Sequence, residues 1–266
     1  MTTIALTIAG SDTGGGAGIQ ADLRTFAFHR VHGASAITCV TAQNTIGVTD
    51  VAAMSPAMVK AQLAAIFDDL SPNAAKTGML LNREIIEAVA DFLAERSFSH
   101  LVVDPVMVSR VGVQLIDDRA VASLKELLLP QASIVTPNIY EAQILSEREI
   151  RNIAEMKQAA VTIRDRLGVK VVLIKGGGLT NDASSTDVWF DGGGWEILSE
   201  SRIDTKNTHG TGCTLSAAIA ANLALGKDLL TAVTEAKQYV TIALQNSLDI
   251  GRGSGPVGHF FPILDS

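Results

Sequence analysis

Short runs of apolar, mostly β-branched residues alternate with longer helical patterns along most of this chain. Runs of this kind indicate strands that are buried on both faces, as in parallel sheets covered by helices. The sequence therefore predicts an α/β fold with a mostly parallel central sheet and helices on both faces. The expected strands span residues 4–9, 34–41, 101–103, 134–135 and 169–174. The expected helices span residues 17–28, 56–67, 82–96, 155–167, 214–225 and 229–248.

A small antiparallel hairpin is expected at the edge of this sheet. Two apolar runs, residues 186–190 and 195–198, flank Asp191-Gly-Gly-Gly, which is typical of a tight hairpin turn. No repeat, no low-complexity segment and no linker rich in proline, serine or charge interrupts the sequence. We therefore expect a single domain over residues 1–266.

The composition narrows the class of protein. The chain has 266 residues, of which 47% are hydrophobic and 18% charged, so it can bury a large core. Its formal net charge of −7 and the lack of a basic tract argue against a nucleic-acid partner. Cys39 and Cys213 lie far apart without CxxC spacing, which favours reduced thiols in the cytoplasm. We expect no signal peptide and no membrane span, because no basic leader and no apolar run of about 18 residues occurs.

The segment Asn207-Thr-His-Gly-Thr-Gly-Cys precedes a helical pattern of small apolar residues. The start of a helix leaves backbone N–H groups unpaired and carries partial positive charge, and glycines there let an anion come close to the backbone. The segment therefore fits a binding site for phosphate, or for charge that develops on phosphate. The alternative is a tight turn that Thr208 or Thr211 caps.

Polar or glycine residues follow four of the expected strands. In an open parallel sheet, ligands bind beyond the carboxyl ends of the strands, so these residues are expected to converge at one edge. The N-terminal glycines are not a P-loop, because no lysine follows Gly15 or Gly16, and they lack the GxGxxG dinucleotide pattern. We interpret them as a loop over a small molecule. The four segments are residues 10–16, 104–107, 136–141 and 175–178.

The charged and amide residues in these segments allow two interpretations each. Lys175 is either a cation that approaches nucleotide phosphates or a surface lysine at the start of a glycine turn. Asn138 and Glu141 either place a hydrated Mg²⁺, which usually takes one or two carboxylates, or form a helix cap after a proline-terminated strand. Asp104 is either a second group near metal and phosphate or an Asx-turn residue before a proline.

Taken together, the motifs resemble the ribokinase-like superfamily and, within it, the hydroxymethylpyrimidine/phosphomethylpyrimidine kinases of thiamine biosynthesis. The resemblance runs in family order from near the first residue to near the last. It implies a ribokinase-like three-layer α/β/α fold. The segments that carry it are Leu6-Thr-Ile-Ala-Gly-Ser-Asp, Gly14-Gly-Gly-Ala-Gly-Ile-Gln-Ala-Asp, Thr41-Ala-Gln-Asn-Thr, Lys76-Thr-Gly-Met, Asp104-Pro-Val-Met, Thr136-Pro-Asn, Lys175-Gly-Gly, Asn207-Thr-His-Gly-Thr-Gly-Cys and Gly255-Pro-Val.

The resemblance implies a pocket for the pyrimidine. An aminopyrimidine offers an exocyclic donor and ring acceptors; an ionised Asp22 only accepts hydrogen bonds, whereas Gln43 both donates and accepts. The apolar members of the pocket are expected to pack on the ring faces. The alternatives are that Gln43 caps a strand end and that Asp22 is a solvated helix position. The implied pocket residues are Gly10, Ala17, Asp22, Gln43, Met79 and Val106.

The resemblance also implies ATP as phosphoryl donor, with Mg²⁺, and a homodimer. For Lys237, the alternative is an exposed lysine without a ligand, because a lysine in a long helix is ordinarily exposed. The residues implied near ATP are Asn138, Lys175, Thr208 and Lys237; Asp104 and Glu141 are the candidates near the metal; and Gly210, Thr211, Gly212 and Cys213 are the implied anion hole.

The implied activity is phosphorylation of a hydroxymethylpyrimidine to its monophosphate and then to its diphosphate. Phosphoryl transfer depends mostly on positioning and on stabilisation of charge. Many sugar kinases of the superfamily carry an aspartate base where Cys213 stands. A cysteine thiol has a pKa of about 8.5, which a helix N-terminus can lower, so Cys213 either assists removal of the hydroxyl proton or only forms a wall of the pocket; we favour assistance. The second step needs no base, because its acceptor is already an anionic phosphate oxygen.

Two other functions are considered. Some relatives that also phosphorylate pyridoxal carry a second cysteine after the Asp-Pro-Val-Met motif, and residues 108–112 of this chain contain none. This difference argues against a pyridoxal kinase, which stays the alternative enzyme. A regulatory ATP-binding module without catalysis is the other alternative, and the intact segment 210–213 with Lys175 and Asn138 argues against it.

Overall fold

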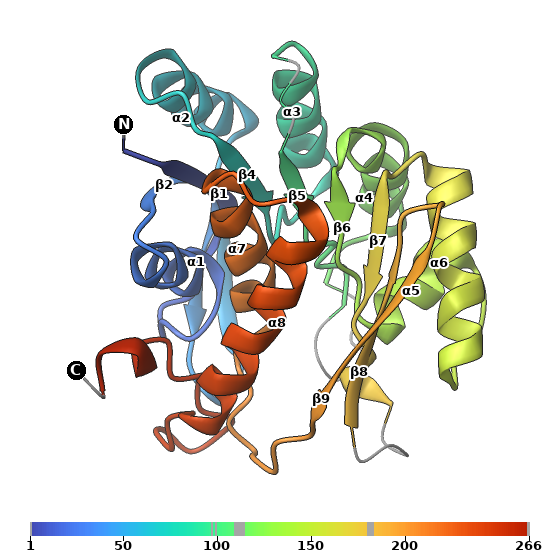
Figure 1. Ribbon diagram of the computed structural model, residues 1–266. Coiled ribbons are helices and arrows are strands. Elements are labelled where there is room, and N and C mark those ends of the chain that lie inside the picture. Colours follow the sequence, from blue (N-terminus) through green and yellow to red (C-terminus); the bar gives the residue numbers. More distant parts are fainter. Residues whose placement is uncertain (1, 97, 99, 109–114, 180–183, 265–266) are drawn as a thin grey trace. The chain divides into compact units, whose positions relative to one another are not determined.

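The computed structural model describes residues 2–96, 98, 100–108, 115–179 and 184–264 (Figure 1). The chain forms two compact units, Met1–Leu80 with Ile203–Ser266, and Leu81–Arg202. We refer to them as the first and second units. The expectation of a single domain stays a prediction.

The first unit contains a sheet with the strand order β3-β2-β1-β4. Strand β1 pairs in parallel with β2 on one side and with β4 on the other, so that Ala5 lies between Gly33 and Ala74. Strand β3 is antiparallel to β2. The strand order therefore reverses around β1, and the glycine-rich segment follows its carboxyl end, where ligands bind in open α/β sheets. The strands are β1 (Ile4–Ser11), β2 (His32–Gln43), β3 (Val48–Ala53) and β4 (Ala74–Thr77).

The helices of the first unit are α1 (Gly18–Phe28), α2 (Pro56–Asp69), α7 (Thr211–Ala224) and α8 (Leu229–Gln245). Helix α1 packs against β1, β2 and α7, whereas α2 packs against β2, and α7 packs against α8. The crossover through α1 leads from β1 to β2, whereas the one through α2 leads from β2 and β3 back past β1 to β4. Because crossovers between parallel strands are right-handed, these opposite directions place α1 and α2 on opposite faces of the sheet. Small, fully buried residues of α7 such as Ala217 and Ala221 allow close packing with both neighbouring helices.

The second unit contains strands in the order β5-β6-β7-β8-β9. Strands β5, β6 and β7 are parallel, and β8 and β9 form the antiparallel hairpin that the Asp191-Gly-Gly-Gly segment predicts. The strands are β5 (Leu101–Val103), β6 (Ile134–Val135), β7 (Val171–Ile174), β8 (Ser184–Phe190) and β9 (Trp195–Ser201); the α-helices are α3 (Arg83–Ala94), α4 (Asp118–Ser123), α5 (Ile139–Ser146) and α6 (Ile153–Leu167). Short helical turns span Leu124–Leu128, Leu129–Gln131 and Gly176–Gly178, and another, Phe261–Ile263, belongs to the first unit.

The strands and helices that the sequence predicts are confirmed within a few residues of their expected ends. Helix α7 begins at Thr211, three residues before the expected start at 214. The sequence analysis missed β3, β4, α4 and α5. Strand β3 is exposed along its whole length and its apolar residues do not alternate with polar ones, and β4 has only four residues, one of them Lys76. No helix in the described part of the chain is long and apolar enough to cross a membrane.

Candidate active site

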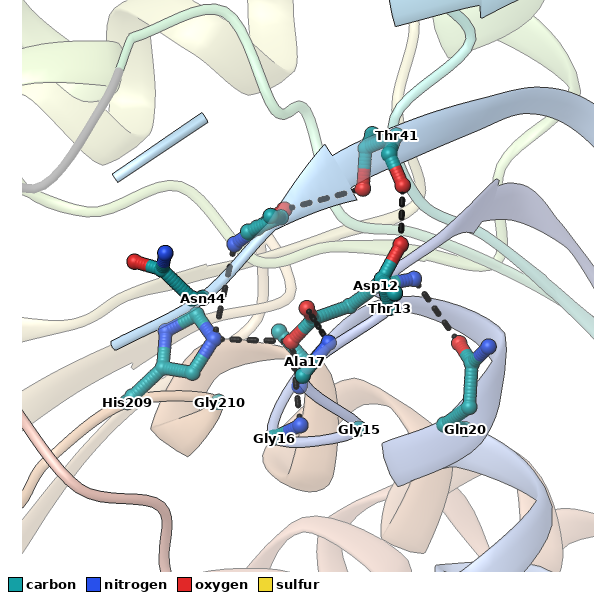
Figure 2. Close-up of polar contacts among 12 residues, drawn as sticks. Asp12, Thr13, Gly15, Gly16, Ala17, Gln20, Thr41, Asn44, His209 and Gly210 are labelled. Atoms are coloured by element: carbon teal, nitrogen blue, oxygen red, sulfur yellow. Dashed lines mark hydrogen bonds and ion pairs between the residues drawn. The ribbon is translucent and has the colours of Figure 1, made fainter. Parts of the chain in front are cut away.

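The carboxylate of Asp12 organises the loop that follows β1. Its Oδ1 atom accepts a hydrogen bond from the backbone N–H of Gly14 at 2.9 Å. Its Oδ2 atom accepts from the backbone N–H groups of Gly16 at 3.0 Å and Ala17 at 2.8 Å (Figure 2). The backbone N–H of Asp12 itself donates to the side chain of Gln20 at 2.8 Å. The glycine-rich loop is therefore fastened to a single buried side chain and to the first turns of α1.

His209 joins this loop to the segment before α7. Its Nε2 atom lies 2.8 Å from Oδ2 of Asp12 and 3.5 Å from Nε2 of Gln43 (Figure 2). Because a carboxylate only accepts hydrogen bonds, the proton must be on Nε2 of His209. Burial would raise the pKa of Asp12, but the hydrogen bonds from His209 and from the backbone of Ala17 and Gly14 outweigh it and hold that pKa below its ordinary value. Asp12 is thus an ionised anchor at neutral pH.

The backbone of Gly210 lies directly against the glycine-rich loop. Gly210 has a φ of +82°, and a Cβ atom added to it would lie 1.8 Å from the carbonyl oxygen of Gly16. A Cβ atom on Gly16 would lie 2.5 Å from Cδ2 of His209 and 3.0 Å from Cβ of Pro256. Side chains are therefore excluded at Gly16 and Gly210, and the two segments meet backbone to backbone.

Helix α7 begins without a side-chain cap, and its N-cap residue is Gly210. By contrast, side chains of Ser55, Asn82, Asn152 and Asp228 cap α2, α3, α6 and α8. The hydroxyl of Thr211 donates instead to the carbonyl of Thr208 at 2.6 Å. The first turn of α7, which includes Gly212 and the half-buried Cys213, thus has no side-chain cap, and its N-terminus carries the partial positive charge of a helix start.

A buried histidine supports the same turn from within the first unit. Nε2 of His259 lies 2.9 Å from Oγ1 of Thr214, which also lies 2.8 Å from the carbonyl oxygen of Gly210. The hydroxyl of Tyr239 donates to the backbone carbonyl of His259 at 2.9 Å. Burial, together with the nearby charge of Arg24, lowers the pKa of His259 to about 4, so this imidazole is neutral at physiological pH.

The first unit also holds most of the expected pyrimidine pocket. The backbone N–H of Gly10 donates to the carbonyl of Met79 at 3.2 Å. A Cβ atom on Gly10 would lie 2.6 Å from Sγ of Cys39 and 3.0 Å from Cε of Met79, so no side chain fits there. Gln43 ends β2, and its Oε1 atom accepts from the hydroxyl of Thr41 at 3.3 Å. Gly10 and Met79 are thus in contact, and Ala17 lies beside the Asp12–His209 pair (Figure 2). The side-chain amide of Gln43 lies next to His209 of the same pair.

Asp22 lies deeper than its neighbours. Its side chain is wholly buried, and its Oδ2 atom accepts a hydrogen bond from the hydroxyl of Thr7 at 2.6 Å. Lys76 is equally buried, and its Nζ atom lies 3.1 Å from the same oxygen. The sequence analysis named Lys76 only as the first residue of a family motif and gave it no role, although its place beside apolar Ala74 and Ala75 was an available signal. The buried partners of this carboxylate thus include Thr7 and Lys76. A direct contact between Asp22 and the pyrimidine stays a prediction.

The expected ATP and metal residues of the second unit form a cluster of their own. Nζ of Lys175 lies 2.9 Å from Oδ1 of Asp104, and the two side chains are 16% and 4% exposed, so Lys175 is not an ordinary surface lysine. Asn138 and Glu141 form a capping box at the start of α5: Asn138 Oδ1 accepts from the backbone N–H of Glu141 at 3.0 Å, and Glu141 Oε2 accepts from that of Asn138 at 2.8 Å. The helix-cap interpretation of this pair is therefore realised.

Glu141 has an unusual protonation equilibrium. Burial raises its pKa to about 8, the charge of Lys175 opposes this rise, and the charge of Asp104 adds to it. No group of three or more histidine, cysteine, aspartate or glutamate side chains suited to a metal ion occurs among the described residues. Two carboxylates in one charged cluster still fit a largely hydrated Mg²⁺, which usually takes one or two carboxylates and keeps several waters.

The remaining predicted residues lie in distinct settings. Lys237 is buried in α8, with 7% of its surface exposed, rather than solvated. The backbone N–H of Thr208 donates to the hydroxyl of Ser254 at 3.3 Å, and among the described residues the buried Oγ1 atom of Thr208 has no hydrogen-bond partner. Val106 follows β5 in the second unit and is partly buried. The sequence analysis compared residues 108–112 with relatives that also phosphorylate pyridoxal. Of these, residues 109–112 lie outside the described residues.

Comparison with known proteins identifies the family. The family model described as phosphomethylpyrimidine kinase matches residues 12–258. The chain belongs to the phosphomethylpyrimidine kinase family. A relative in Synechococcus elongatus named hydroxymethylpyrimidine/phosphomethylpyrimidine kinase is 60% identical over 98% of both chains. The family resemblance and the kinase class inferred from the sequence motifs are thereby confirmed.

Solved structures confirm the ribokinase-like fold. The ADP complex of Bacillus subtilis pyridoxal kinase matches with a TM-score of 0.93 and 39% identity, covering 99% of this chain and 100% of that one. Phosphomethylpyrimidine kinase from Clostridium difficile matches with a TM-score of 0.82 and 40% identity, covering 91% of this chain and 100% of that one. The fold is thus shared by enzymes named for two different substrates, so the fold alone does not select the substrate.

Proposed function

We propose that the chain phosphorylates 4-amino-5-hydroxymethyl-2-methylpyrimidine with ATP, first to the monophosphate and then to the diphosphate, in thiamine biosynthesis. The observation that carries this proposal is the 60% identity, over 98% of both chains, to a relative named for both kinase activities. The geometry of residues 207–213 supports it, because the uncapped first turn of α7 offers backbone N–H groups to an anion.

In the first step, the hydroxymethyl oxygen attacks the γ-phosphorus of ATP, the bond to the β–γ bridging oxygen breaks, and the hydroxyl proton leaves. In the second step, a phosphate oxygen of the monophosphate attacks a second ATP, and no hydroxyl proton has to be removed. Backbone N–H groups of Gly210, Thr211, Gly212 and Cys213 are proposed to stabilise the charge on the transferring group in both steps. Cys213 is proposed to accept this proton, as its thiolate, in the first step only.

Gln43 is proposed to read the edge of the aminopyrimidine, because its amide both donates and accepts hydrogen bonds. Its Nε2 atom, 3.5 Å from a His209 nitrogen that already donates to Asp12, can donate to a ligand. Gly10, Ala17, Met79 and Val106 are proposed as apolar contacts of the ring. Asp22, which is also the ion-paired partner of Lys76, is proposed to accept a hydrogen bond from the aminopyrimidine.

ATP is proposed to contact Asn138, Lys175, Thr208 and Lys237. The buried Oγ1 atom of Thr208, which has no hydrogen-bond partner within the described part of the chain, is a donor and acceptor that a phosphate or ribose oxygen can satisfy. Asp104 and Glu141 are proposed to hold a hydrated Mg²⁺, which when bound neutralises phosphate charge. The proposal also includes a homodimer, which the family resemblance implies, and a cytoplasmic location, which the cysteine usage favours.

The test is mass analysis of products after incubation of the protein with Mg-ATP and either hydroxymethylpyrimidine or pyridoxal. We expect the pyrimidine to give monophosphate and then diphosphate. Phosphorylation of pyridoxal alone would overturn the proposal in favour of a pyridoxal kinase, the activity for which the Bacillus subtilis structure is named. Binding of nucleotide without any product would favour a regulatory module.

A further inference from the structure

Asp12 lies at the point where the glycine-rich loop and the segment before α7 are joined. One oxygen atom, Oδ2, accepts hydrogen bonds from the backbone N–H groups of Gly16 and Ala17 and from the imidazole of His209 (Figure 2). The side chain of Asp12 is 2% exposed and that of His209 is 24% exposed. A single buried carboxylate oxygen therefore holds three donors that come from segments about 200 residues apart in sequence.

The backbone of His209 is fixed independently of its side chain. Its N–H donates to the carbonyl of Gly255 at 3.1 Å, and its carbonyl accepts from the N–H of Val257 at 3.2 Å. The imidazole reaches from this fixed backbone to Asp12, while the next residue, Gly210, lies against the carbonyl oxygen of Gly16. Movement of the loop would therefore have to break the Asp12–His209 contact and change the close approach of Gly16 to Gly210.

We propose that Asp12 and His209 are positioning residues that fix the pyrimidine-side backbone at Ala17 and the anion-side backbone at Gly210 in one geometry for both phosphoryl transfers. This inference rests on the proposed function. It assigns these two residues a role through the backbone N–H groups and carbonyls that they hold, rather than through the reacting atoms. A displacement of about 1 Å in such a site can lower the rate roughly 100-fold.

The test compares Asp12→Ala, His209→Leu, His209→Gln and the double variant Asp12→Ala/His209→Leu. Values of kcat and KM are measured for both steps, using purified monophosphate as substrate for the second. The matched control is Asp191→Ala, because Asp191 also accepts two backbone hydrogen bonds, from Gly193 and Gly194 at 2.8 Å, but does so in the β8–β9 hairpin. Melting temperatures show whether each variant is folded.

We expect each single variant to lower kcat of both steps by a similar factor, roughly 10- to 100-fold, with a smaller change in KM. The double variant should be no worse than the poorer single variant, because both remove the same contact. His209→Gln should recover much of the loss, since its amide N–H can donate to Asp12. Asp191→Ala should retain the kcat of the unaltered protein.

Three results would overturn the inference. If only the first step were slowed, His209 would be a proton acceptor. If the losses of the single variants multiplied in the double variant, the two residues would have independent roles. If His209→Gln recovered no activity, the hydrogen bond to Asp12 would not be the cause of the loss. If Asp12→Ala does not fold, the His209 variants still decide the matter. If the unaltered protein phosphorylates no pyrimidine, the proposed function fails, and this outcome is distinct from the others.

Discussion

Gly16 and Gly210 face each other so closely that a methyl group on Gly210 would lie 1.8 Å from the carbonyl oxygen of Gly16. The obstacle is backbone rather than the flexible end of a side chain, so it cannot move aside without displacing the glycine-rich loop. Glycine at position 210 therefore serves two purposes at once, the positive φ of the N-cap and the close approach of two segments of the first unit.

We predict that Gly210→Ala destabilises the protein and lowers the activity of both steps. The positive φ alone costs roughly 1–2 kcal/mol for a residue with a Cβ atom, and the overlap with Gly16 adds to that cost. Gly226→Ala is the matched control: its φ is +85°, yet a Cβ atom there has no heavy atom within 4 Å among the described residues. Thermal unfolding of both variants separates the two costs, and equal losses would contradict the overlap.

We predict a large cost for breaking the buried ion pair of Lys76 and Asp22. Both side chains are fully buried, so Lys76→Met leaves an uncompensated carboxylate, at a cost of about 3–5 kcal/mol. Lys206→Met is the control, because Lys206 and Asp249 lie at the same 3.1 Å separation with 71% and 73% of their side chains exposed. Chemical denaturation should show a shifted midpoint for Lys76→Met alone.

A double variant tests whether the unpaired charge of Asp22 causes this loss of stability. Asp22→Asn/Lys76→Met removes both charges and keeps an acceptor for the hydroxyl of Thr7, so it should be more stable than Lys76→Met alone. If the double variant were the less stable of the two, packing rather than charge would explain the loss.

We predict that Glu141 makes the protein less stable as the pH rises from about 5 to 8. Burial raises the pKa of Glu141 from its ordinary 4.5 to about 8, so the folded state holds a proton there that the unfolded state releases. This contribution to stability is complete below pH 4.5 and is lost as the pH rises through 8. Relative to the unaltered protein, Glu141→Gln should therefore gain stability with rising pH.

Denaturant unfolding at pH 5, 6.5 and 8 measures this difference. The substitution keeps the capping box, because glutamine can take the place of glutamate in that motif. Glu155→Gln, at the equivalent position of α6, is the matched control, since Glu155 also follows a capping asparagine but is only half-buried. A stability difference between Glu141→Gln and the unaltered protein that is independent of pH would contradict the prediction.

We predict that Cys213→Ala slows the first phosphorylation more than the second. Removal of a general base costs roughly 100-fold or more in rate, and only the first acceptor carries a hydroxyl proton. Rates with hydroxymethylpyrimidine and with its monophosphate measure the two steps separately. Equal losses would leave Cys213 as a wall of the pocket.

Much of the architecture could be predicted from local pattern. Uninterrupted apolar runs such as those of β5 and β7 can only be buried, and the glycines after Asp191 allow only a turn, so the α/β class and the hairpin followed from composition and spacing. The sequence motifs also led to the kinase family. Strand β3 could not be found in this way, because the apolar residues of this exposed edge strand do not alternate with polar ones.

The roles of individual polar residues required the tertiary structure. Asp22 and Asp12 are both aspartates near glycine-rich sequence, yet Asp22 is paired with a lysine from β4, and Asp12 with a histidine from the segment before α7. These partners lie 54 and 197 residues away. The sequence by itself determined the local elements and the family, because those depend on neighbouring residues; only the fold decided which charges meet, because a buried charge is stabilised by whatever distant donor the packing brings to it.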